Sequence, residues 1–110
     1  MAPPAAIDFG TLCNELDALI SAPPAGDAAK RAELERTLTD GYASALTLEA
    51  ERLRLERRIG EVAAGLGRPD KEQEGEELAD LSLRLSQASS DLRRLRERLV
   101  QLRQRVSAAA

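Results

Sequence analysis

Aromatic residues, histidine and cysteine are scarce in this 110-residue chain, which has one Phe, one Tyr, one Cys and neither Trp nor His. So few ligands cannot assemble a structural zinc site, and we expect neither a metal nor a cofactor. Cys13 is the single cysteine and excludes an internal disulfide, which favours a reducing compartment and a cytoplasmic protein. We expect Cys13 to be a small buried hydrophobe.

Long apolar runs and recognisable catalytic motifs are also missing. No apolar stretch reaches the roughly 18 residues that a membrane span requires. The N-terminus, MAPPAAID, has neither the basic region nor the apolar core of a signal peptide. The sequence shows no nucleophile–base pair, metal cluster or phosphate loop. We therefore expect a protein that is not an enzyme.

Helix-forming residues dominate what is present. Ala, Glu, Lys, Leu and Arg make up 65 of the 110 residues, above the roughly 50% that is typical of long helices and coiled coils when periodic. Residues that favour strands are few. The preference for Arg over Lys, 14 to 2, together with abundant Ala, is typical of a GC-rich bacterial genome. The composition predicts one all-α domain.

Breaks in the pattern divide the chain into three predicted helices. Residues 1–26 form a flexible end and a short helix from about Phe9 to Ser21, with Asp8 as its N-cap. Pro23 and Pro24 end that helix, and Asp27 caps the next. Residues 27–107 are predicted to form an antiparallel helical hairpin. Its arms are about 27–66 and 76–107, and the acidic residues 67–75 form its turn. Residues 70–77 could instead be the exposed first turn of the second arm.

Two heptad series carry the prediction of a hairpin, because a spacing of 3 and 4 keeps one seam facing one partner. The first arm has eight apolar residues among ten seam positions, namely Leu34, Leu38, Gly41, Ala45, Leu48, Arg52, Leu55, Ile59, Val62 and Leu66. The second arm has nine among nine, namely Leu78, Leu81, Leu85, Ala88, Leu92, Leu95, Leu99, Leu102 and Val106. In the first arm, Gly41 would let a bulky partner approach closely.

Flanking charges select one of two registers that differ by a heptad. One register places Leu48 opposite Leu99, and the other places Leu48 opposite Leu92. Apolar matching scarcely separates them, so charge pairs decide. The second register brings Glu51 to Asp91 and Arg58 to Arg84, which are repulsions, and we therefore predict the first register from its attractive pairs. These pairs are Glu49 with Arg96, Glu51 with Arg98, and Arg58 with Asp91.

The second arm also carries an arginine cluster, DLRRLRERLVQLRQRV at residues 91–106, which raises nucleic-acid binding as an alternative. A DNA-binding helix usually belongs to a basic domain with a continuous basic face. This chain carries a net charge of −3, and the arginines are spread around the helix. We interpret the cluster as a partly paired coiled-coil face. A regulator that binds nucleic acid through Arg93, Arg94 and Arg103 stays an alternative.

Apolar side chains outside the seam point to further packing. We call Leu46, Leu53, Leu83 and Val100 the apolar rim. We expect a second copy to cover the rim, giving a homodimeric four-helix bundle. The N-terminal helix could instead close the core within one chain. The function predicted from this pattern is a scaffold or adaptor that recognises helix faces, with itself or another helical protein as partner.

Arg52 lies in the seam of the first arm. Its stem either packs in the seam while its guanidinium reaches solvent at the edge, or the guanidinium binds an anion. The surrounding stretch ERLRLERRIGEVAAGLGRP, residues 51–69, resembles the end of the first helix of the AroQ-type chorismate mutases. That resemblance implies an all-helical dimer in which Arg52 binds a substrate carboxylate. The family's other cations would fall on Ala63, Glu35 and Gly75. The alternative is therefore a degenerate mutase-like dimer that binds a small anion near Arg52.

Overall fold

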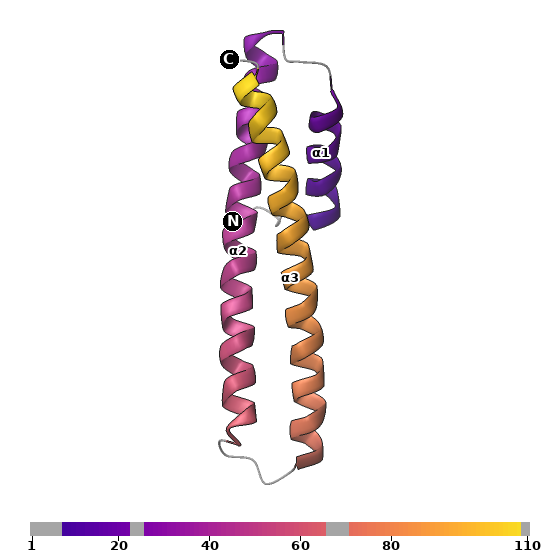
Figure 1. Cartoon of the computed structure of the whole chain (residues 1–110), viewed down its shortest axis with the longest axis vertical. Coiled ribbons are helices and arrows are strands. Elements are labelled where there is room, and N and C mark those ends of the chain that lie inside the picture. The colour runs from indigo at the N-terminus through magenta and orange to yellow at the C-terminus, as the bar shows by residue number, and fades with distance from the viewer. Residues whose placement is uncertain (1–7, 23–25, 66–70, 109–110) are drawn as a thin grey trace, which may run out of the picture. The chain divides into compact units, whose positions relative to one another are not determined.

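The computed structural model describes residues 8–22, 26–65 and 71–108, which form three helices (Figure 1). Helix α1 spans Phe9–Ser21, α2 spans Ala28–Ala63 and α3 spans Lys71–Ala108. No strand occurs in these ranges, so the predicted all-α class is confirmed. Within the described helices, no segment combines the length and apolarity that a membrane crossing requires. The flexible end predicted at residues 1–7 and the seam residue Leu66 lie outside the described residues.

Aspartates begin two of the helices. Asp8 Oδ2 accepts a hydrogen bond from the backbone N–H of Thr11 at 3.1 Å, and Asp27 Oδ1 accepts one from Lys30 at 2.8 Å. Each carboxylate satisfies a first-turn N–H that has no acceptor within its helix. Both predicted N-caps are confirmed.

The boundaries of the predicted turn are corrected at both ends. Helix α2 ends at Ala63, and Gly65 follows it with a φ of 68°, a left-handed conformation that glycine adopts without strain. Helix α3 begins at Lys71, so residues 71–75 are helical instead of forming part of the turn. Glu72 and Glu74 lie in its first turn, where the partial positive charge of the helix N-terminus favours carboxylates. Residues 67–70 of the predicted turn lie outside the described residues.

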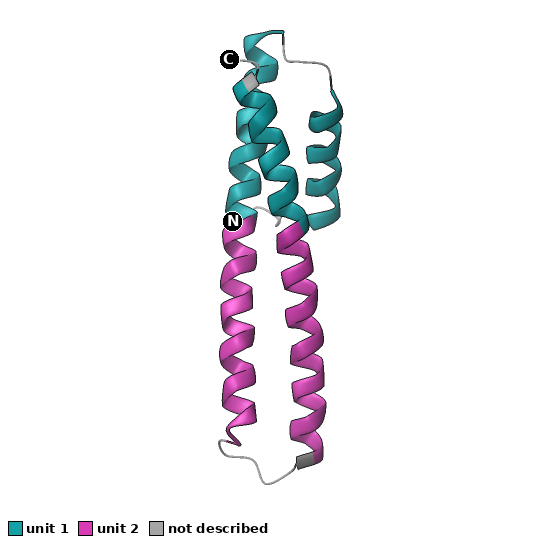
Figure 2. Cartoon of the chain, in the orientation of Figure 1, with its two compact units in different colours: residues 1–44, 94–110 teal, residues 45–93 magenta. Residues whose placement is uncertain are grey.

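The chain divides into two compact units, which are described separately (Figure 2). Unit 1 contains residues 1–44 and 94–110, and unit 2 contains residues 45–93. Unit 1 combines α1 with the first part of α2 and the last part of α3. Unit 2 is a hairpin formed by the rest of the two long helices, paired antiparallel.

Each unit has its own apolar core. In unit 2, Leu55, Val62, Leu81 and Ala88 are buried, and Ile59, Leu78 and Leu85 pack against them. Other seam residues of unit 2 are the buried Leu92 and the half-buried Leu48. In unit 1, the buried residues are Leu12, Cys13 and Leu16 of α1, Leu34 of α2, and Leu95, Leu99 and Leu102 of α3. The predicted burial of Cys13 is confirmed.

The register predicted from flanking charges is wrong, as both units show. In unit 1, Gly41 lies against Leu99, because a Cβ on Gly41 would be 3.5 Å from Leu99 Cγ and would overlap Leu99 Cδ2. In unit 2, Arg58 donates a hydrogen bond to Glu77 at 2.8 Å. The predicted register would place Glu77 about 18 Å along α3 from the residue opposite Arg58. The register that places Leu48 opposite Leu92 accounts for both contacts.

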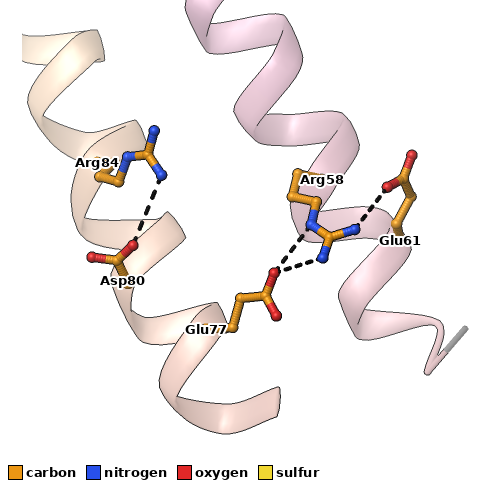
Figure 3. Close-up of polar contacts among 5 residues, drawn as sticks. All are labelled: Arg58, Glu61, Glu77, Asp80 and Arg84. Atoms are coloured by element: carbon orange, nitrogen blue, oxygen red, sulfur yellow. Dashed lines mark hydrogen bonds and ion pairs between the residues drawn. The ribbon is translucent and has the colours of Figure 1, made fainter. Parts of the chain in front are cut away.

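Flanking charges do not fix the register here, because arginine side chains reach carboxylates about one helical turn away. In the observed register, Arg58 and Arg84 approach each other, which counted as a repulsion. Figure 3 shows that each turns toward a carboxylate instead: Arg58 contacts Glu77 and Glu61, and Arg84 Nη1 lies 3.9 Å from Asp80 Oδ2. Local contacts therefore remove the repulsion on which the prediction depended.

Candidate functional site

Four of the six charged residues predicted to set specificity, Glu51, Arg58, Asp91 and Arg98, make contacts other than those expected. Arg58 pairs with Glu77 instead of Asp91, and Asp91 accepts a hydrogen bond from Gln87 at 2.9 Å. Glu51 lies 3.7 Å from Arg54 within α2. In unit 1, Arg98 pairs with Asp17 of α1. Glu49 and Arg96 belong to different units, and their pairing stays a prediction.

One side of unit 2 is charged (Figure 3). Arg58 donates from Nε and Nη2 to Glu77 Oε1 at 3.1 and 2.8 Å, and Nη1 donates to Glu61 Oε2 at 3.3 Å. The hydrogen bond to Glu77, followed by that to Glu61, raises the pKa of Arg58 above its ordinary value. We call the residues drawn in Figure 3 the charged side of unit 2: Arg58, Glu61, Glu77, Asp80 and Arg84.

The opposite side of unit 2 carries leucines and small residues. Arg58 and Glu77 each precede a seam residue and meet across the hairpin, so residues that follow the same seam positions lie on the other side. These residues are Leu46, Leu53 and Gly60 on α2, and Ala79, Ser86 and Arg93 on α3. Ser82 lies at the adjoining position of α3, as Glu49 and Glu56 do on α2. We call the uncharged residues Leu46, Leu53, Gly60, Ala79, Ser82 and Ser86 the neutral side; all six are exposed, and the three charged residues border them.

The structure does not unite the predicted apolar rim into one surface. Leu46 and Leu53 are 66% and 61% exposed, and because they are one heptad apart they form a stripe. Leu83 is 71% exposed. At roughly 100° per residue, it lies about 200° around α3 from both Leu81 and Leu85, which places it on the outer face of the helix. Val100 is 55% exposed and belongs to unit 1.

Arg52 lies in the seam of unit 2 and borders the neutral side. The observed register places the small, buried Ala88 opposite it, which leaves space for the arginine stem. Its Nη2 lies 3.6 Å from Glu56 Oε1, and its side chain is 37% exposed. Its Nε is buried and has no hydrogen-bond partner. Glu56 thus occupies part of the guanidinium that an anion would need.

In unit 1, helix α1 packs against α3 of its own chain. Leu12, Cys13 and Leu16 form its buried face. Asp17 accepts hydrogen bonds from Arg98 Nε at 2.9 Å and Nη2 at 3.3 Å, a paired geometry that is among the stronger ionic contacts. The hydrogen bond to Asp17 raises the pKa of Arg98, so the guanidinium keeps its charge.

Two further arginines of α3 contact α1 at its ends. The guanidinium carbon of Arg94 lies 5.8 Å from the centre of the Phe9 ring, which is a cation–π distance. Arg105 donates a hydrogen bond to the carbonyl of Ala22, which caps α1. Contacts at Phe9, Asp17 and Ala22 follow the order of their partners along α3. Helix α1 therefore runs parallel to α3.

Sequence reasoning placed these arginines in the hairpin and missed their contacts with α1. A signal was present, because residues 1–27 carry a charge of −4 and residues 81–110 carry +5. This complementarity joins the N-terminal segment to α3 and lies outside the two heptad series, so the charges that flank the seams do not reveal it. The contacts account for three of the six arginines in residues 91–106, namely Arg94, Arg98 and Arg105.

Comparison with protein-family models, curated proteins and solved structures found no match to this chain. The resemblance of residues 51–69 to the chorismate mutases therefore rests on those residues alone. Among the described residues, no group of three or more His, Cys, Asp or Glu side chains could hold a metal ion.

Proposed function

We propose that this chain is a non-enzymatic helical interaction protein that self-associates through the neutral side of unit 2. The observation that carries the proposal is the exposed stripe of Leu46 and Leu53, in which Leu53 lies level with the small Ser86 of α3. Two exposed leucines one heptad apart, next to small side chains, are suited to pack against another helix. In the cell the protein would act as a scaffold or adaptor, in the cytoplasm.

The neutral side is complementary to itself. The leucines lie on α2, and Ala79, Ser82 and Ser86 lie on α3. In a two-fold dimer, the leucines of one copy can pack onto the small residues of the other, and the reverse contact follows from the symmetry. Gly60 adds open space, because a Cβ there would meet no atom within 4 Å. A second copy is therefore the partner that this surface fits best.

The leucines set the scale of the expected affinity. Burying four leucines that are about two-thirds exposed would contribute on the order of 4–8 kcal/mol. Association itself costs roughly 4–15 kcal/mol. The leucines are thus necessary for a dimer, and additional contacts must supply the remainder. We expect a dimer whose dissociation is measurable at micromolar concentrations.

The test is molar mass in solution across a range of protein concentrations, by light scattering and sedimentation. We expect the 11.9 kDa chain to form a dimer, and Leu46→Ser with Leu53→Ser to weaken it at least ~30-fold, since ~2 kcal/mol or more is lost at 1.4 kcal/mol per tenfold. Leu83→Ser is the matched control, because Leu83 is equally exposed on another face. It should leave the dimer intact.

A second substitution tests the α3 half of the same surface. Ser86→Arg places a long charged side chain among the small residues and should weaken the dimer while leaving the helical content unchanged. Three results would refute the proposal: a wild-type monomer at every concentration, equal weakening by Leu83→Ser, or indifference to Ser86→Arg. Salt-sensitive binding to nucleic acid that is lost on neutralising Arg93 and Arg103 would favour the alternative regulator instead.

A further inference from the structure

Helix α1 has the properties of a segment that can leave its site without global unfolding. It contains 13 residues, and isolated helices shorter than roughly 12–15 residues are marginal in water. Its buried face consists of Leu12, Cys13 and Leu16, whereas Leu19 and Ile20 stay partly exposed. Few buried apolar residues make a segment open at lower cost than the whole domain.

The surface of α3 in unit 1 is built to hold an additional helix. Leu95, Leu99 and Leu102 are at most 2% exposed there. In unit 2, where the described residues form a two-helix hairpin, Leu92 is 1% exposed, but Leu55, Val62 and Leu81 are 5% exposed and Ile59 and Leu85 stay partly exposed. The extra burial in unit 1 accompanies the docking of α1. Without α1, this part of α3 would present leucines bordered by arginines.

The contacts made by α1 define the chemistry of its occupant. The occupant must present two leucines one helical turn apart, an aromatic ring near its start and a carboxylate near its end. The leucines face the buried Leu95, Leu99 and Leu102 of α3, the ring faces Arg94, and the carboxylate pairs with Arg98. Its last carbonyl groups must accept a hydrogen bond from Arg105. An acidic amphipathic helix that runs parallel to α3 has all these features.

We infer that this part of α3, with Arg94, Arg98 and Arg105 along it, is a docking site for an acidic amphipathic helix of a partner protein. Helix α1 is the in-chain competitor that occupies the site until such a partner displaces it. Because α1 is tethered close to its site, its effective concentration is high. The partner must therefore bind more tightly than α1 would as a free peptide. Binding of weaker, nonspecific helices to this site is suppressed. The inference concerns unit 1 and does not depend on self-association through unit 2.

Cys13 provides a direct readout of this displacement in the wild-type chain. It is the single cysteine and is 5% exposed on the buried face of α1. A thiol reagent should label it only when α1 leaves α3. The probe is a synthetic peptide of residues 8–22 that carries Cys13→Ser, which cannot react. We expect native labelling to be at least ten times slower than labelling of the denatured chain, and saturating peptide to accelerate it at least tenfold.

Two controls separate docking from nonspecific effects. A peptide that also carries Asp17→Lys loses the contact with Arg98 and should need at least ten times more peptide for the same acceleration. A chain with Leu46→Ser and Leu53→Ser should respond as the wild type does, because those residues belong to unit 2. This control distinguishes failure of the docking site from failure of the proposed self-association.

The outcomes decide the inference in either direction. Acceleration by the peptide that depends on Asp17 supports a site that a helix can enter from outside the chain. A labelling rate that does not change with added peptide would overturn it, as would equal acceleration by the two peptides. Labelling of native protein as fast as that of denatured protein would also overturn it, because α1 would then not occupy the site.

Discussion

The contact between Gly41 and Leu99 gives the sharpest test of the helix register. Gly41 is buried within α2, and a Cβ there would overlap Leu99 Cδ2 and lie 3.8 Å from Cδ1. Leu99 is 2% exposed, so its side chain has little room to move aside. The change we consider first is Gly41→Ala, alone and combined with Leu99→Ala.

Two opposing effects set the magnitude. Alanine is better than glycine in a helix interior by about 1 kcal/mol, whereas overpacking a core costs roughly 1–3 kcal/mol. We therefore expect Gly41→Ala to destabilise the protein by up to ~2 kcal/mol in the wild-type background. Leu99→Ala should destabilise it by about 2–5 kcal/mol, because it leaves a cavity.

The combination reverses the sign of the first change. With Leu99 shortened, the overlap disappears, and Gly41→Ala should stabilise the chain by about 1 kcal/mol. The interaction energy between the two sites is then about 1–3 kcal/mol, within the range for residues in contact. Sites without a shared contact would give additive changes.

The assay is urea unfolding followed by circular dichroism, at one protein concentration because self-association adds apparent stability. Gly75→Ala in α3 is the matched control, since a Cβ there meets no atom within 4 Å and Gly75 is not among the residues of the neutral side. It should stabilise both backgrounds equally, by about 1 kcal/mol. If Gly41→Ala behaves in the same way, Leu99 does not face Gly41, and the register described above is incorrect.

Two further predictions concern arginines of unit 2. Arg52→Leu should leave the free energy of unfolding in urea unchanged or raise it by up to ~2 kcal/mol, because an apolar residue replaces a half-buried cation whose Nε is buried. Arg54→Leu is the control, and it should not stabilise the chain because Arg54 is exposed. A marked loss of stability with Arg52→Leu would indicate a bound anion or an essential contact. Arg58→Glu should lower the melting temperature and Glu77→Arg should restore it, whereas Arg57→Glu should change it little; a double variant no more stable than the single one would contradict the pairing. The hydrogen bond to Glu77 raises the pKa of Arg58. The contribution of Arg58 to folding stability is therefore complete below its unfolded pKa and is lost only as the pH rises through its folded pKa. This stabilisation should persist from neutral into mildly alkaline solution.

Much of the fold follows from local patterns in the chain. A 3.5-residue apolar period over two long segments predicts two helices with facing seams, because no other regular structure places those residues on one line. Asp8 and Asp27 predict where α1 and α2 begin, since their carboxylates accept first-turn N–H groups whatever the rest of the chain does. The opening that Gly41 leaves for a bulky residue could also be anticipated.

The register and the partner of α1 depended on the tertiary structure. A slip by one heptad leaves apolar residues facing apolar residues, so the choice falls to charge pairs worth about 0.2–1 kcal/mol each. Those pairs do not predict the register reliably, because a long arginine side chain can reach carboxylates on different helices. Arg98 turns to Asp17 and Arg58 to Glu77, and neither choice is local in sequence. Periodicity reports which face of a helix is buried, whereas the fit of particular side chains in three dimensions decides what lies against that face.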